Sequence, residues 1–522
     1  MDAYDVVVVG AGHNALVAAA YLARSGKSVL VLESDERVGG FVRTDEFAPG
    51  FFGDTYSAAH TLFVAGQVWS ELGEDLGAQG LRYLSTDFAS GVSMEDGATA
   101  VMPRTTEDFV VEADRLAPGD GAAFADMMEE VGPLVPDIFA LFDLDLTSAP
   151  AKEILDRLLR QGSGYSPFAA SVLESARDAV SRFSSPAMRS MLGSWPTHFS
   201  KAPDEAGGGL WAKLFLLASM QSGLPVPQGG SGKLAEALSA VVHAAGGVVR
   251  TGERVSAIGV QGGRATSVST ADGQRYAARQ AVIASVNPDQ LYLGLLDDDV
   301  VPQALARQAR GYRYGRGQVQ INLALSETPA WPDERFTCVG QPFLTDSLDG
   351  LALHVTQTMA GALPAKPTVS VHSPSAIDPT RAPAGQAVMR VQVTDVPVRP
   401  TSDAGGRIEV GDGTWTRELA DRFTDRVLDV VGAHLPNISS AVIARSIITP
   451  SDLARANANA GPGDPYGGAQ DLAQSFFFRP LPGQPSHRTH IPNLFTLGAG
   501  TWPGGGVSGA SGRIVARQLL TP

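Results

Sequence analysis

The pattern of apolar and polar positions in residues 4–33 predicts a strand, a helix and a second strand in succession. The run YDVVVV (4–9) is largely apolar and ends at a glycine, which is typical of a strand buried on both faces. The alanine-rich segment NALVAAAYLARSG (14–26) has helical spacing, and Gly26 lies where a C-terminal cap belongs. KSVLVLE (27–33) is a second buried strand that ends in an acid. The pattern therefore predicts one βαβ unit at the start of the chain.

Beyond residue 100 the pattern changes between mainly helical and mainly strand-like regions. From about Thr105 to Ser222, apolar residues recur at helical spacing between polar breaks. Apolar runs such as QVQINLAL (318–325) and AVMRVQV (387–393) predict strands later in the chain. Residues 415–435 again have the spacing of an amphipathic helix. The chain as a whole thus combines helices and strands.

The apolar segments are too short to predict a membrane span or a secretory signal. The longest, GGGLWAKLFLLASM (207–220), contains Lys213 and three glycines and falls short of the ~20 residues that cross a bilayer. We interpret it as a buried or interfacial helix. The N-terminal apolar run 6–9 is far shorter than the apolar region of a signal peptide.

Composition and charge exclude several classes of function. A chain of 522 residues is too long for a single ordinary hydrophobic core, so two or more lobes are expected. The net charge of −15 argues against nucleic-acid binding, which depends on clustered Lys and Arg. The single cysteine, Cys338, excludes a disulfide framework and a cysteine-based metal site, and no other metal-ligand spacing stands out. These features fit a cytoplasmic protein without a metal ion.

The turn between the first strand and the first helix carries a dinucleotide fingerprint. Gly10, Gly12 and Ala15 occupy the three small-residue positions: the tight turn, the close backbone approach to a pyrophosphate, and the helix–strand contact. The helix N-terminus offers free N–H groups and partial positive charge to phosphates. Glu33 follows about twenty residues later at the end of the second strand, where a carboxylate binds an adenosine ribose. The sequence therefore predicts a dinucleotide site.

The N-terminal residues and three later segments resemble one family. YDVVVVGAGHNALVAAAYLARSGKSVLVLESDERVGG (4–40), with its glycine pair Gly39–Gly40, resembles the N-terminus of the carotenoid (phytoene) desaturase-like flavoproteins. It is nearest to their branch of carotene ketolases and pyridine nucleotide-disulfide oxidoreductase domain-containing proteins. PQGGSGKLAEAL (227–238), FFFRPLPGQPSHRTHIPNLFTLGAG (476–500) and TWPGGGVSGASGR (501–513) are similar to later motifs of this family.

The resemblance implies non-covalently bound FAD and a fold of the α/β class. It implies a Rossmann-type FAD-binding domain, as in glutathione reductase and the amine oxidases, joined to a mixed α+β substrate domain with a helical lid. The FAD-binding domain would be discontinuous, with segments 1–100, 225–300 and 465–522. The substrate-binding domain with its helical cap would take segments 101–224 and 301–464.

By the same similarity, a set of residues is expected to contact FAD along its length, from the adenine to the isoalloxazine ring. They are Gly10, Gly12, Asn14, Ala15, Glu33, Ser34, Gly39, Gly40, Arg43, Val255, Gly498, Gly506 and Val507. Gly506 and Val507 would open a helix directed at the isoalloxazine ring. Phe41 replaces an arginine that many relatives carry, so Arg43 is either a cofactor contact or a surface arginine.

No residue pattern identifies an acid or base for the chemistry. Tyr56 and His60 follow the glycine pair at a distance that in relatives approaches the flavin, although a structural role for either is an alternative. Trp502 stands where relatives often have a histidine and would give an apolar wall. These three residues are the catalytic candidates. The helices between 105 and 222 are either a lobe core or a lid over a lipophilic substrate.

The function implied by the resemblance is that of an FAD-dependent dehydrogenase, desaturase or oxidase. It would move a hydride from a substrate C–H to flavin N5, on a lipophilic or small organic substrate, with oxygen or a quinone as electron acceptor. Peripheral membrane contact is compatible with such a substrate. The alternatives are an amine or amino-acid oxidase of related fold, a flavin-dependent isomerase, and a non-catalytic flavoprotein scaffold.

Overall fold

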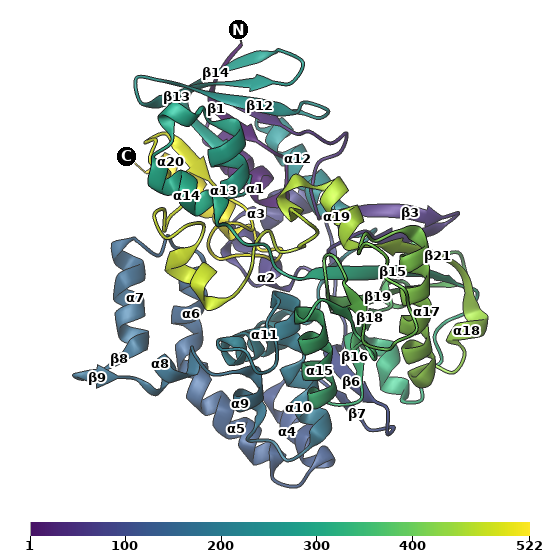
Figure 1. Cartoon of the computed structure of the whole chain (residues 1–522). Coiled ribbons are helices and arrows are strands. Elements are labelled where there is room, and N and C mark those ends of the chain that lie inside the picture. Colours follow the sequence, from purple (N-terminus) through teal and green to yellow (C-terminus); the bar gives the residue numbers. More distant parts are fainter. Residues whose placement is uncertain (1, 522) are drawn as a thin grey trace.

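The computed structural model describes residues 2–521, and within them two large sheets form the framework (Figure 1). The first sheet has seven strands in the order β11-β2-β1-β14-β13-β12, with β22 also paired to β14. Its strands are β1 (Ala3–Val9), β2 (Val29–Leu32), β11 (Val248–Arg250), β12 (Val255–Gln261), β13 (Arg264–Thr270), β14 (Arg275–Ala284) and β22 (Leu494–Thr496).

The centre of the first sheet is parallel and buried on both faces. β1 runs parallel to β2 and β14, with Val8 opposite Val31 and Ile283. One face is covered by α1 (His13–Arg24), α12 (Gly232–Ala244) and α20 (Ala510–Leu520). Strand, helix and strand therefore follow one another as the sequence pattern predicts, and the α/β class is confirmed.

The second sheet is mixed and also has seven strands among the described residues, in the order β21-β15-β19-β18-β16-β6-β7. These strands are β6 (Phe88–Met94), β7 (Thr99–Val101), β15 (Gly317–Leu325), β16 (Val339–Thr345), β18 (Val369–His372), β19 (Ala387–Val396) and β21 (Val442–Ile448). One face of β15, with Val319, Ile321 and Leu323, joins the core formed with α17 (Arg417–His434). The other face of the same strand is free to line a cavity, because side chains alternate across a strand.

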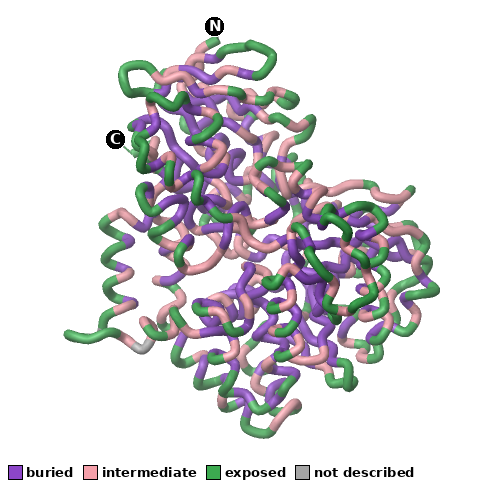
Figure 2. Tube along the Cα trace, viewed as in Figure 1, coloured by how far each residue is buried: buried purple, intermediate pink, exposed green. Residues whose placement is uncertain are grey.

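A group of helices between residues 106 and 222 forms the lower part of the molecule in Figure 1. They are α4 (Thr106–Leu116), α5 (Asp120–Val131), α6 (Val135–Phe142), α7 (Ala149–Leu159), α8 (Pro167–Ser171), α9 (Ala176–Val180), α10 (Pro186–Gly193) and α11 (Gly208–Ser222). The apolar segment 207–220 lies in α11 and is largely buried, as expected (Figure 2). Among residues 2–521, no helix is both long and apolar enough to cross a membrane.

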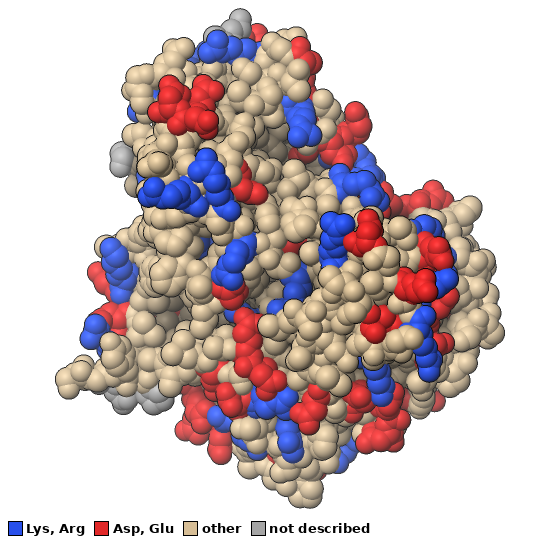
Figure 3. Space-filling view, in the orientation of Figure 1, with Lys and Arg blue, Asp and Glu red and all other residues tan. Residues whose placement is uncertain are grey.

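Shorter elements connect these parts. They are β3 (Thr44–Ala48), β4 (Phe51–Asp54), α2 (Thr61–Val64), α3 (Gln67–Ala78), β5 (Tyr83–Leu84), β8 (Arg160–Gln161), β9 (Gly164–Tyr165), β10 (Val226–Pro227), α13 (Pro288–Gln290), α14 (Gln303–Arg310), α15 (Leu348–Met359), β17 (Ala362–Leu363), α16 (Pro374–Ile377), β20 (Ser402–Asp403), α18 (Ile438–Ala441) and α19 (Pro450–Ala456). Acidic and basic side chains are interspersed over the face shown in Figure 3.

The strands of the first sheet come from the beginning, the middle and the end of the chain. β6, however, lies inside the segment 1–100 and pairs with β16 of the second sheet, with Gln341 opposite Ser90. The expected cofactor segment 1–100 therefore contains one strand that belongs to the other sheet. The physical reason is that strand pairing is non-local, so a local pattern cannot show it.

Candidate functional site

A cavity of about 720 Å³, here called the first cavity, lies at the carboxyl ends of β1, β2 and β14. This is the edge at which parallel α/β sheets bind their ligands. Residues 454–459, at the end of α19 and just after it, form part of its wall. The expected cofactor contacts that line it are Gly10, Gly12, Glu33, Ser34, Gly40, Arg43 and Val255.

The β1–α1 turn is shaped to admit a ligand close to its backbone. Gly10 has a φ of +90°, and a Cβ there would lie 3.3 Å from Ser285 Cβ. Gly12 is the N-cap of α1 and has no capping side chain, so the helix N-terminus is open. A Cβ at Gly12 would meet nothing within 4 Å. The turn thus leaves space beside free N–H groups, which suits a pyrophosphate.

Glu33 is held rigidly at the edge of the first cavity. The backbone N–H of Ala11 donates to its Oε2 at 2.6 Å, and the N–H of Asp35 donates to its Oε1 at 2.9 Å. Ser34 Oγ donates to Oε1 at 3.1 Å. The carboxylate therefore ties the end of β2 to the β1–α1 turn while it faces the cavity.

The glycine pair and Arg43 occupy the same side of the molecule. The N–H of Gly39 donates to Ala11 O at 2.8 Å, while Gly40 lines the cavity. Arg43 also lines the cavity, and it pairs with Asp35 at 3.4 Å and Asp45 at 3.2 Å. Two carboxylates already compete for its charge, so its role as a cofactor contact stays a prediction.

Four expected cofactor contacts, namely Asn14, Ala15, Gly39 and Gly498, line neither large cavity. Asn14 and Ala15 are buried in the first turns of α1, and Ala15 packs in the core beneath the helix. Gly498 has a φ of +108°, and its backbone N–H donates to Ser511 Oγ at 3.0 Å. These residues shape the backbone around the cavity.

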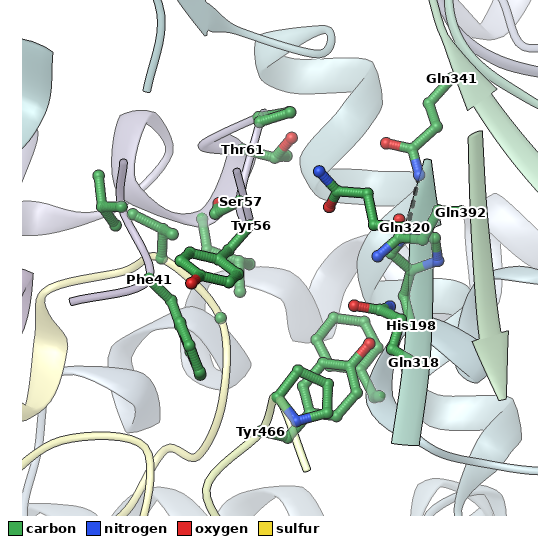
Figure 4. Close-up of a pocket in the computed structure, with 18 of the residues that line it drawn as sticks. Phe41, Tyr56, Ser57, Thr61, His198, Gln318, Gln320, Gln341, Gln392 and Tyr466 are labelled. Atoms are coloured by element: carbon green, nitrogen blue, oxygen red, sulfur yellow. Dashed lines mark hydrogen bonds between the residues drawn. The ribbon is translucent and has the colours of Figure 1, made fainter. Parts of the chain in front are cut away.

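A second cavity, of about 240 Å³, lies between the first sheet's loops and the free face of the second sheet. Tyr56 lines both cavities, so the two adjoin. One wall is mainly apolar and comprises Phe41, Ala59, Leu62, Phe199, Phe215 and Leu224. A second part of the lining, here called the polar wall, comprises His198, Gln318, Gln320, Gln341, Arg390 and Gln392. Figure 4 shows Tyr56 and the glutamines on opposite sides of the cavity.

Hydrogen bonds fix most of the polar wall. The amide of Gln341 donates to His198 Nε2 at 2.7 Å, and Gln320 Nε2 donates to Asp54 O at 2.6 Å. Arg390 donates from Nη2 to Tyr56 O at 2.6 Å and from Nη1 to Gln392 Oε1 at 3.1 Å. The wall is therefore a preorganised surface, held mainly by contacts within the protein.

Sequence reasoning missed the polar wall, although a signal for it exists. In GQVQINL (317–323), Gln318, Gln320 and Asn322 alternate with apolar residues, and in AVMRVQV (387–393) Arg390 and Gln392 do the same. When a strand of a buried sheet has polar residues at every second position, one face of the sheet is polar and is expected to meet a cavity or a ligand. Reading these runs only as strands overlooked that face.

Burial controls the ionisation of the groups at the second cavity. Burial, together with the charge of Arg390, lowers the pKa of His198 to about 3, so the imidazole is neutral at neutral pH. Burial also lowers the pKa of Arg390 to about 10, which leaves it a cation. The pKa values of the Tyr56 and Tyr466 hydroxyls are raised by burial. At neutral pH, Arg390 is the charged group among the described residues that line this cavity.

The three catalytic candidates lie in different surroundings. Tyr56 lines both cavities, with its ring 4.6 Å from that of Phe41. His60 is fully buried, with Nδ1 bonded to Tyr83 OH at 2.8 Å and Nε2 to Ser231 Oγ at 2.7 Å. The structure therefore brings Tyr56 to the cavities and places His60 in the packing behind them.

Trp502 lies away from both large cavities. It is 8% exposed and packs in the core of the helical lid, with Nε1 donating to Leu141 O at 3.0 Å. Its ring lies 5.5 Å from Phe142 of α6 and 5.8 Å from Phe476. Trp502 thus joins the C-terminal motif to the lid.

The C-terminal motif reaches the second cavity through Gly506 and Val507. The expectation that these two residues open a helix is wrong, because α20 begins at Ala510. Gly506 has a φ of +115° and Gly509 a φ of +74°, and both values lie outside the right-handed helical region. Residues 504–509 are instead a glycine-rich loop against the cavity.

Together the two cavities fit an extended dinucleotide that carries a flat ring system. The first offers an open helix N-terminus, a fixed carboxylate and glycines without Cβ atoms. The second adjoins it at Tyr56 and is reached by the loop 504–509. Among the described residues, no group of three or more His, Cys, Asp or Glu side chains is arranged to hold a metal ion.

Comparisons with known proteins agree with this geometry. A family model described as flavin containing amine oxidoreductase matches residues 16–520. Pyridine nucleotide-disulfide oxidoreductase domain-containing protein 2 of Mus musculus is 29% identical, over 99% of this chain and 93% of its own. Phytoene desaturase (neurosporene-forming) of Cereibacter sphaeroides is 24% identical, over 100% and 95%.

A solved structure shows the same fold. Cyclohexylamine oxidase from Brevibacterium oxydans superposes with a TM-score of 0.59 at 14% identity, over 99% of this chain and 98% of its own. The resemblance to phytoene desaturase-like flavoproteins is confirmed, and FAD is the cofactor. The chain belongs to the flavin-containing amine oxidoreductase family and is an FAD-dependent oxidoreductase.

Proposed function

We propose that the first cavity holds the adenosine and pyrophosphate of FAD and that the second holds its ring system together with the substrate. The support is the placement of the motif residues. Gly10, Gly12, Glu33 and Val255 line the first cavity, whereas Gly506 and Val507 line the second. In this proposal the FAD-binding domain is built from the segments 1–100, 225–300 and 465–522, without β6, and the remaining segments bind the substrate.

The reaction we propose is oxidation of a C–H bond in an organic substrate with a largely apolar body. Bound FAD supplies the hydride acceptor, at flavin N5. The single observation that carries the proposal is the apolar wall of the second cavity, with Phe199, Phe215 and Leu224, in a cavity that adjoins the dinucleotide site. This wall orients an apolar substrate and excludes water. Oxygen or a quinone is the proposed electron acceptor.

The protein groups at the cavity also suit this chemistry. None of the described residues that line it is an Asp or a Glu, and His198 is neutral. A reaction that depends on a strong protein base would need such a group within reach of the substrate. Hydride transfer to a cofactor requires the protein mainly to position the reactants.

The amine oxidase alternative is disfavoured by Arg390. A buried cation in the wall repels a substrate ammonium group, and the described lining contains no carboxylate to attract one. The relative named phytoene desaturase favours a lipophilic substrate. An amino-acid oxidase, a flavin-dependent isomerase and a non-catalytic scaffold are the remaining alternatives, and experiment separates them.

The test is anaerobic mixing of the purified FAD-loaded protein with candidate substrates while the visible spectrum is recorded. An oxidase or dehydrogenase loses its flavin absorbance, which returns with oxygen or a quinone. Conversion of substrate without a lasting loss of absorbance identifies an isomerase instead. No conversion across a broad series of apolar substrates contradicts an enzymatic role.

A pair of variants localises the substrate to the second cavity. Ala59 lines the apolar wall, whereas Ala78 is exposed at the end of α3. We expect Ala59→Leu to slow anaerobic flavin reduction by about tenfold or more, because added methylenes fill the cavity. Ala78→Leu, the matched control, should leave the rate unchanged. Equal rates in the two variants would place the substrate elsewhere.

A further inference from the structure

The polar wall contains a buried cation without a carboxylate partner. Arg390 is 5% exposed and lines the second cavity. Its hydrogen-bond partners are the carbonyl of Tyr56 and the amide oxygen of Gln392, both neutral. Within residues 2–521, no Asp or Glu lies within ion-pairing distance of it. Buried charges in proteins are normally paired, so this arrangement points to a missing anion.

The neighbouring charges do not compensate Arg390. Asp54, whose charge acts on Arg390, is buried and already pairs with the equally buried Arg381 at 3.1 Å. His372, opposite Arg390 in the β18–β19 ladder, is also buried, and burial lowers its pKa to about 3. It is therefore neutral at neutral pH. Two guanidinium groups thus face one carboxylate, and one positive charge remains uncompensated.

The buried atoms of the wall that lack a hydrogen-bond partner are donors. Arg390 Nε, Gln318 Nε2 and His198 Nδ1 are buried and have no partner among the described residues. Because the Gln341 amide donates to His198 Nε2, the proton of the neutral ring lies on Nδ1. Buried donors without a partner suit a ligand that accepts hydrogen bonds.

We propose that the second cavity takes an organic monocarboxylate, with its carboxylate bound by Arg390 in the polar wall and its apolar body against the apolar side chains of the lining. This inference rests on the proposed function and names its substrate class. One uncompensated guanidinium matches one carboxylate in charge and in planar geometry. A phosphate dianion would carry one negative charge in excess. The cavity volume of about 240 Å³ is shared with the flavin ring system in the proposed function, so the acid is small.

Calorimetric binding of three probes of equal length tests the proposal on the FAD-loaded protein. The probes are octanoate, octanol and octylamine, which present an anionic, a neutral and a cationic head group. We expect octanoate to bind about tenfold or more tightly than octanol, and octylamine not to bind. Octanoate binding should also shift the flavin spectrum. Equal affinity for octanoate and octanol, or preference for octylamine, overturns the proposal.

Variants identify the group responsible. Arg390→Met should weaken octanoate binding by about tenfold or more and leave octanol binding within about twofold. Arg445→Met is the matched control, because Arg445 lies in the same sheet but pairs with Asp421 and Asp425 outside the cavity. His198→Phe serves if Arg390→Met does not fold, and it should weaken octanoate binding alone, by about threefold or more. Unchanged octanoate affinity in the folded variant overturns the assignment.

The outcomes remain distinct from those of the proposed function. Octanoate selectivity is read from heat and from the flavin spectrum, so it does not depend on turnover. If the protein binds octanoate selectively but oxidises no acid, the carboxylate site is supported and the proposed reaction is contradicted. If the protein oxidises neutral apolar substrates and shows no preference for octanoate, the proposed reaction is supported and the carboxylate site is contradicted.

Discussion

At the scale of single residues, Glu33 combines a structural and a binding role. Its carboxylate accepts N–H groups from Ala11 and Asp35, and thereby ties β2 to the β1–α1 turn. It also lines the first cavity, where the family resemblance assigns it to the ribose of FAD. A substitution there acts on the cofactor through both routes.

Glu33→Arg is expected to weaken FAD binding by about tenfold or more, because it removes a charge-assisted acceptor and adds a bulky cation beside the ribose site. Fluorescence titration of the apoprotein with FAD measures this. Glu74→Arg, an exposed change on α3, is the matched control and should bind FAD normally. Retention of full FAD affinity by the Glu33 variant would show that the carboxylate does not face the cofactor.

The buried side chain of His60 should make the free energy of unfolding depend on pH. Burial lowers its pKa from 6.5 to about 3, so the unfolded chain takes up a proton before the folded chain does as the pH falls. The stability contributed by neutral His60 is therefore present above about pH 6.5 and is lost toward pH 3, by about 1.4 kcal/mol per pH unit. Urea unfolding of the His60→Gln variant should show a smaller loss of unfolding free energy than wild type as the pH falls from 6.5 to 3. The same slope in variant and wild type would refute the buried neutral state.

At the scale of elements, the two glycines of the β1–α1 turn lack a side chain for different reasons. Gly10 has a positive φ and a close neighbour, so its side chain is excluded by the protein itself. Gly12 has an extended backbone, and a Cβ there meets nothing within 4 Å. The absence of a side chain at Gly12 is thus explained by a ligand and not by the protein.

Gly12→Ala should leave the thermal stability of the apoprotein within about 1 kcal/mol of wild type and weaken FAD binding by about tenfold or more, because the added methyl group enters the space of the pyrophosphate. Gly77→Ala on α3 is the control, since a Cβ there also meets nothing within 4 Å. It should keep full FAD affinity and be as stable as wild type or slightly more so. Equal FAD binding by both variants would contradict the pyrophosphate assignment.

The elements also show where sequence reasoning succeeds and fails. The β1–α1–β2 unit was predictable because buried strands, a helix and the glycines that join them all lie within residues 3–33. The start of α20 was not, because Gly506 and Gly509 adopt positive φ values that composition alone does not reveal. The polar wall was overlooked although Gln318 and Gln320 alternate with apolar residues. Its significance depends on which face of the sheet meets the cavity.

At the scale of the whole molecule, the FAD site brings together distant parts of the chain. β1, β14 and β22 lie side by side although they come from the beginning, the middle and the end of the sequence. Arg513 of α20 pairs with Glu71 of α3 at 2.7 Å, which secures the C-terminal helix to the N-terminal region. The pairing of β6 with the second sheet is equally distant, and no local pattern indicates it.

Because residues from the beginning of the chain, from its middle and from 454–459 line the first cavity, FAD should stabilise the molecule as a unit. Free FAD at 100 times its dissociation constant is expected to add about 2.7 kcal/mol to the free energy of unfolding. Thermal unfolding with and without FAD measures the effect. Riboflavin, which lacks the adenosine and pyrophosphate, is the control and should stabilise much less. Equal stabilisation by the two compounds would contradict a role for the first cavity.

The most direct test of the central claim is the visible absorption spectrum of the purified protein, followed by identification of the released chromophore. The account predicts flavin absorbance and one FAD per chain, either as purified or after reconstitution with FAD. The Gly12→Ala and Glu33→Arg variants should lose that absorbance on gel filtration. A colourless wild-type protein that cannot be reconstituted with FAD would contradict the claim that this chain is an FAD-dependent oxidoreductase.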